Sequence, residues 1–135
     1  MKTSKTYQLN HAHFEHKLWR NELETIAQEA TFFLTILDEY KLFTLNNSHQ
    51  SLMVAEFVNQ FHHYQRLTNR LLQELSGIEK ELAQGVLNDN ILDKELKKDH
   101  QYLNDEMKYV ESDYRATKMK FRDFVASYET VAILN

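Results

Sequence analysis

Apolar side chains recur along this chain at alternating spacings of three and four residues, in three long blocks. A repeat that averages about 3.5 residues places such side chains on one side of an α-helix, whereas a β-strand would alternate at every second residue. The three series are His16, Trp19, Leu23, Ile26, Ala30, Phe33, Leu37 and Tyr40; then Phe57, Phe61, Tyr64, Thr68, Leu71, Leu75, Ile78 and Leu82; then Leu96, His100, Leu103, Met107, Val110, Tyr114, Thr117, Phe121, Phe124, Tyr128 and Val131. The pattern predicts an all-α fold.

Residues that interrupt helices are scarce. The chain has no proline and two glycines, Gly77 and Gly85, which favours long helices over sheets and tight turns. Two polar segments, 44–49 (TLNNSH) and 84–90 (QGVLNDN), separate the three series. Asn47 or Ser48 suits the N-cap of the second helix, and Gly85 suits the end of that helix. We therefore predict helices at about 10–43, 48–85 and 90–133, after a short tail at residues 1–9.

Short loops make consecutive helices antiparallel neighbours, and helices this long can bury their apolar sides only against each other. Residues 10–135 are thus expected to form one domain, an up-down-up antiparallel three-helix bundle with coiled-coil-like heptad packing. In general shape such a bundle resembles a spectrin-type repeat, although no motif is shared.

Two histidines occupy positions in the apolar series. Counting outward from the two loops places His16, Leu75 and His100 in one layer of the bundle. One interpretation is a polar layer whose side chains are satisfied by each other or by a nearby carboxylate, which can fix helix register. The alternative is a metal or small-ligand site that uses His16, His100 and His13, since neutral imidazole is a common ligand. The sequence has no Glu-x-x-His pair of the kind found in di-iron bundles, and we predict no cofactor.

Apolar residues outside the three series gather toward one end of the predicted bundle. The candidate interface residues are Phe32, Leu34, Ile36, Met53, Val58 and Val125. They either widen the core or form a surface for a homodimer or another protein partner, because monomers rarely expose large apolar patches.

Other classes of function find little support in the sequence. There is no Gly-rich phosphate loop, nucleophile elbow or HExxH motif, so we expect no enzyme. The net charge of −4 gives no general attraction to nucleic acid, although the basic segment 115–122 keeps a phosphate-binding or membrane-surface adaptor as a third hypothesis. The absence of cysteine and of any long apolar run predicts a cytoplasmic protein without a membrane span. The leading hypothesis is a non-enzymatic, self-associating interaction or scaffold protein.

Overall fold

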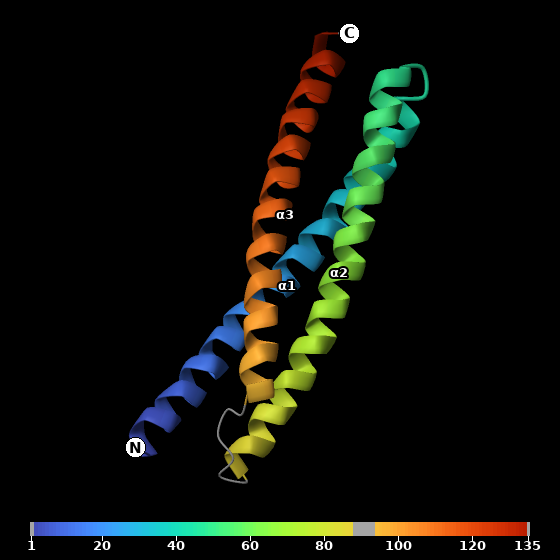
Figure 1. Ribbon diagram of the computed structural model, residues 1–135. Helices are drawn as coiled ribbons and strands as arrows, with labels where there is room; N and C mark the ends of the chain where they lie inside the picture. Colours follow the sequence, from blue (N-terminus) through green and yellow to red (C-terminus); the bar gives the residue numbers. More distant parts are fainter. Residues whose placement is uncertain (1, 88–93, 135) are drawn as a thin grey trace.

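The computed structural model of the chain describes residues 2–87 and 94–134, and the side chains of residues 10–84 and 95–128. Three long helices make up almost all of this: α1 (Lys2–Phe43), α2 (Ser48–Leu87) and α3 (Lys94–Leu134). They pack as a three-helix bundle without any strand in the described ranges, which confirms the all-α prediction (Figure 1). None of the described helices has a stretch that is long and apolar enough to cross a membrane.

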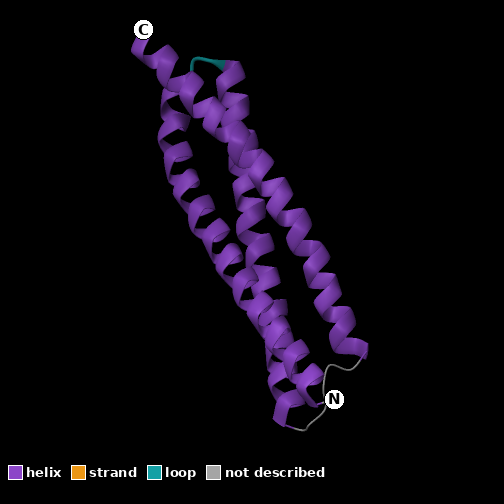
Figure 2. Cartoon of the chain, turned by 90° about the vertical axis from the view of Figure 1, so that its left-hand side faces the viewer, coloured by secondary structure: helices purple, strands orange, loops and turns teal. Residues whose placement is uncertain are grey.

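The helices lie lengthwise beside one another. The turn at residues 44–47 joins α1 to α2 at one end, and the C-terminal end of α3 lies near that turn (Figure 1). The N-terminal end of α1 lies at the opposite end of the molecule. Figure 2 shows how little of the chain is loop compared with helix. The left-handed coiled-coil geometry of the packing stays a prediction.

The helix boundaries differ from the predicted ones at the start of α1 and at the end of α2. Helix α1 begins at Lys2, so residues 2–9 are helical instead of forming a tail. This stretch contains neither Gly nor Pro, so its backbone has nothing that stops the helix. Helix α2 runs on to Leu87, so Gly85 lies inside the helix and does not end it. Helix α3 begins at Lys94, and the predicted start at residue 90 lies outside the described residues.

The start of α2 follows from local hydrogen bonding. The Asn47 side-chain oxygen accepts a hydrogen bond from the backbone N–H of Gln50 at 3.0 Å, which is the N-cap arrangement predicted from the sequence. The backbone carbonyl of Asn47 also accepts from the N–H of Ser51 at 2.9 Å. In the same turn, the buried Thr44 hydroxyl donates to the carbonyl of Tyr40 at 2.8 Å. These hydrogen bonds stabilise the short turn between α1 and α2.

The core follows the three predicted series. Every member from Phe57 to Leu82 is buried, and in the other two series only Phe33, His100 and Tyr128 are partly buried; Val131 lies outside the described side chains. The half of the core toward the 44–47 turn is built from aromatic rings: the ring of Phe61 lies 5.2 Å from Phe33 and 5.1 Å from Phe121 between centroids. Because aromatic rings bury large areas, this half supplies much of the hydrophobic stabilisation.

Candidate functional site

Two histidines from the apolar series meet inside the bundle at its other end. His16 on α1 is 2% exposed, and its Nε2 atom lies 2.9 Å from Nδ1 of His100 on α3. The two residues are 84 positions apart in the sequence, so the contact depends on the register of all three helices. This is the layer that counting from the loops predicted.

Glu79 on α2 binds the opposite side of His16. Its Oε1 atom lies 2.5 Å from His16 Nδ1, and its Oε2 atom lies 3.1 Å from Nδ1 of His13. Sequence reasoning placed Leu75 in this layer and missed Glu79, one helical turn further along α2. The available signal was an acidic residue directly after the buried Ile78, in the half of α2 that faces the histidines.

A second carboxylate, Glu15, extends the arrangement beyond His100. The Nε2 atom of His100 lies 3.7 Å from Glu15 Oε2, and the other oxygen of Glu15 lies 2.5 Å from Nε2 of His11. Six titratable side chains from three helices thus form one continuous row, which we call the histidine–glutamate chain: His13, Glu79, His16, His100, Glu15 and His11.

The single tryptophan of the protein covers the centre of this chain. The centroid of Trp19 lies 5.3 Å from that of His16 and 5.0 Å from that of His100. The indole is itself 8% exposed and belongs to the apolar core. The histidine pair therefore lies against a hydrophobic surface on one side and reaches carboxylates at both ends.

The donors and acceptors available on each side chain determine which ring nitrogens carry hydrogen at neutral pH. An ionised carboxylate only accepts, so His13 and His16 both donate to Glu79 through Nδ1–H. A neutral His16 then has a bare Nε2, which accepts a hydrogen bond from the Nδ1–H of His100.

Burial governs the titration of the pair. Removal from water lowers the pKa of His16, and the neighbouring Glu79 carboxylate offsets part of that effect. Burial likewise lowers the pKa of His100, against the charge of Glu15. Both histidines are consequently held in the neutral form at neutral pH.

The structure brings the three predicted metal ligands into one neighbourhood but not around one point. His16 uses one ring nitrogen on Glu79 and the other on His100, while His13 bonds only to the far oxygen of Glu79 among the contacts described. Within the described parts of the chain, no group of three or more His, Cys, Asp and Glu side chains could hold a metal ion. The arrangement matches the polar-layer interpretation.

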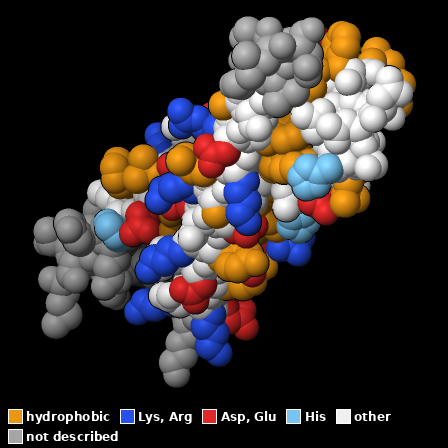
Figure 3. Space-filling model, turned by 90° about the horizontal axis from the view of Figure 1, so that it is seen from above, with side chains coloured by type: hydrophobic (Ala, Val, Ile, Leu, Met, Phe, Trp, Pro, Cys, Tyr) orange, Lys and Arg blue, Asp and Glu red, His pale blue; other side chains and the backbone are white. Residues whose placement is uncertain are grey.

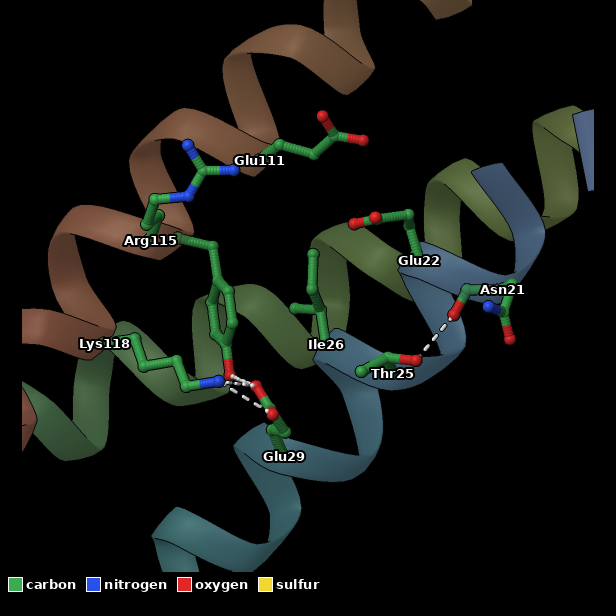
Figure 4. Close-up of a pocket in the computed structure, with 9 residues that line it drawn as sticks. Asn21, Glu22, Thr25, Ile26, Glu29, Glu111, Arg115 and Lys118 are labelled. Carbon is green, nitrogen blue, oxygen red and sulfur yellow. Dashed lines mark hydrogen bonds and ion pairs between the residues drawn. The ribbon is translucent and has the colours of Figure 1, made fainter. Parts of the chain in front are cut away.

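A polar groove lies between α1 and α3 in the middle of the bundle (Figure 4). Glu29 accepts hydrogen bonds there from the Tyr114 hydroxyl at 2.7 Å and from Lys118 Nζ at 2.8 and 2.9 Å. Burial raises the pKa of Glu29, but the bonds from Lys118 and Tyr114 outweigh it and leave the pKa below its usual value. Lys118 belongs to the basic segment 115–122, and it is already bound within the molecule.

Carboxylates and cations alternate along the rest of this groove. Glu111 and Arg115 reach over it from α3, and Glu22 from α1 (Figure 4). Burial raises the pKa of Glu111, the charge of Glu22 adds to the rise, and Arg115 opposes it. The groove contains the acidic and basic groups of a helix–helix contact.

The predicted interface residues differ in their exposure to solvent. Leu34, Ile36, Met53, Val58 and Val125 are partly buried and pack against the main core, so they widen it. Only Phe32 is well exposed, at 60%.

Four exposed apolar side chains lie close together in the sequence around the turn between α1 and α2, whereas others, such as Phe14, Leu18 and Met119, lie elsewhere on the helices. Leu42, Phe43, Leu45 and Leu52 are 71%, 73%, 74% and 59% exposed. Figure 3 looks onto this end of the molecule, where hydrophobic side chains lie at the surface beside uncharged polar ones. We call these four residues the apolar tip. Sequence reasoning noted Leu42 and Leu52 as apolar positions but gave the tip no separate role.

No protein family matches the chain, and no curated protein and no solved structure is significantly similar to it.

Proposed function

We propose that this protein is a non-enzymatic interaction module that associates with a second copy of itself through the apolar tip. The observation that carries the proposal is the exposure of four large apolar side chains within eleven residues, Leu42, Phe43, Leu45 and Leu52. Monomeric proteins rarely expose large apolar patches, and such patches commonly mark sites of protein–protein interaction. A cytoplasmic location, expected from the lack of cysteine, belongs to the same proposal.

The charge pattern favours a second copy as the partner. Charged residues make up 27% of the chain, yet residues 42–55 contain no Asp, Glu, Lys or Arg. In a two-fold symmetric dimer the same surface patch is used by both subunits. An uncharged patch can meet its own copy without repulsion between like charges, whereas a patch with charges of one sign cannot.

A groove between α2 and α3 continues the surface away from the tip. Its lining includes His49 and Gln50 near the turn, and the apolar side chains of Met53, Phe57 and Phe124 further along. Side chains from the tip of a second copy could fill such a groove and bury further apolar area, at roughly 25 cal/mol for each Å² removed from water.

Sedimentation velocity at micromolar concentration tests this proposal. The wild type should sediment as a dimer or larger species, and the double variant Phe43→Glu/Leu45→Glu should sediment as a monomer with unchanged helicity by circular dichroism. Tyr109→Glu is the matched control, because Tyr109 is 67% exposed on α3 and lies outside the tip. A wild type that is monomeric throughout, or a control that dissociates equally, contradicts the proposal.

A further inference from the structure

The histidine–glutamate chain leaves one mismatch when both core histidines are neutral. The Nδ1–H of His100 donates to His16, so the Nε2 atom of His100 carries only a lone pair. That lone pair faces an oxygen of Glu15 at 3.7 Å, which is also an acceptor. No hydrogen bond can form between two acceptors.

One added proton removes the mismatch. Placed on Nε2 of His100, it gives an imidazolium that forms an ion pair with Glu15 at 3.7 Å, and the bond from His100 to His16 is unchanged. The resulting imidazolium lies between two carboxylates, Glu15 at one end and Glu79 beyond His16 at the other. The positive charge can also lie on His16, because the hydrogen between the two rings can be bonded to either nitrogen. The total number of protons on the pair is then unchanged.

A second added proton cannot be accommodated. Both Nε2 of His16 and Nδ1 of His100 would then carry hydrogen at a separation of 2.9 Å, and two positive rings would face each other. The charges around the pair are Glu15, His11 and His13 on α1 and Glu79 on α2. The charge of His11 disfavours a positive ring at His100 and so works in the same direction.

We propose that the His16–His100 pair is an acid-sensitive contact, which keeps the N-terminal part of α3 on α1 with zero or one added proton and releases it when a second proton binds. The aromatic half of the core contains no histidine in its packed rings and holds the helices together at the other end. Acid thus opens one end of the bundle while the other end stays folded. This device is independent of association through the apolar tip.

Trp19 provides the first test, because protonated imidazole in contact with indole quenches its fluorescence. The emission of the wild type should change as the pH falls from roughly 7.5 to 5, a range that brackets the ordinary pKa of histidine. Most of that change should be lost in His100→Leu and kept in His63→Gln, which alters an exposed histidine of α2. Equal changes in wild type and His100→Leu would overturn the proposal.

Glu15→Gln tests where the first proton binds. Removing this carboxylate takes away the acceptor that stabilises the charged His100 ring, so the first step of the fluorescence titration should move to lower pH. An unmoved titration would show that the first proton does not lie between His100 and Glu15.

Spin-label distances test the opening in the protein with its histidines intact. The chain has no cysteine, so labels attach only at introduced sites. Lys17→Cys with Lys97→Cys reports on the end that contains the pair, and Glu39→Cys with Ser127→Cys reports on the aromatic end; all four positions are exposed. The first distance should lengthen and broaden between about pH 7.5 and 5 while the second stays constant. Constant distances in both pairs, or lengthening in both together, would overturn the proposal.

Discussion

Tyr64 on α2 donates its phenolic hydrogen to Asp113 on α3, with 2.5 Å between the two oxygens. The ring of Tyr64 is buried, and its hydroxyl also lies 3.0 Å from that of Thr117. Burial raises the pKa of Tyr64, and the bond to Asp113 raises it further. The contact therefore joins α2 to α3 through a neutral phenol at the centre of the bundle.

Tyr64→Phe should destabilise the protein by about 1–2 kcal/mol, because a hydrogen bond to a charged group is lost while the ring stays in place. Asp113 is only partly buried and regains some water, which keeps the effect toward the lower end. Urea unfolding measures the change. Tyr109→Phe, at an exposed position of α3, is the control and should change stability very little. Equal stability of Tyr64→Phe and wild type would mean that the bond contributes nothing.

Phe61→Ala should cost about 3–5 kcal/mol, since it leaves a cavity among packed rings. Phe61 is fully buried, with Phe57 and Phe121 among its neighbours. Phe32→Ala is the matched comparison, because Phe32 is 60% exposed and should lose well under half as much. Thermal or urea unfolding of both variants measures the two losses of stability. Similar losses in Phe61→Ala and Phe32→Ala would contradict the described core.

Stability should fall on acidification because of His16 and His100. Burial lowers the folded-state pKa of both, so the unfolded chain binds more protons below its own histidine pKa of about 6.5. Their contribution is complete above about pH 6.5 and is lost as the pH falls toward the folded pKa, by at most about 1.4 kcal/mol per pH unit for each histidine.

Urea unfolding between roughly pH 5 and 8 checks this in wild type and His100→Leu. The slope of stability against pH should be shallower in the variant. At neutral pH the variant should be less stable by roughly 1–3 kcal/mol, because Nε2 of the buried His16 loses its donor. Parallel slopes in the two proteins would show that His100 titrates like a solvated residue.

Zinc and chelators should leave the melting temperature nearly unchanged, because both ring nitrogens of His16 are bound to protein groups. A ligand that binds only the folded state would raise stability by RT ln(1 + [L]/Kd). Scanning fluorimetry with added zinc, and with chelator alone, measures this directly. A zinc-dependent rise that disappears in His13→Ala would favour the metal-binding function instead.

The sequence predicted the core well because helix geometry dictates it. A side chain such as Leu71 or Val110 is buried wherever a spacing of three and four residues places it on the inner side of its helix. The meeting of His16 and His100 was predictable for a related reason: short loops fix the helix register to within about a turn.

Contacts that depend on the direction in which an individual side chain points were not predicted from the sequence. Glu79 follows a core position, and only the three-dimensional structure shows that its side chain turns toward His16 and His13. The same holds for Leu34 and Phe32, which look alike in the sequence although one packs on the core and the other faces solvent. Helix rotation of a few tens of degrees decides such cases, and the apolar spacing does not specify it that finely.

The uncharged stretch 42–55 has a consequence for the solution conditions under which association persists. Dissolved salt weakens contacts between charged surfaces by screening them over about 8–10 Å at physiological ionic strength. A dimer joined at the apolar tip has almost no charge at its contact to be screened, and salts such as sulfate strengthen the burial of apolar surface. High-salt buffers that dissociate complexes held by ion pairs would therefore leave this dimer assembled.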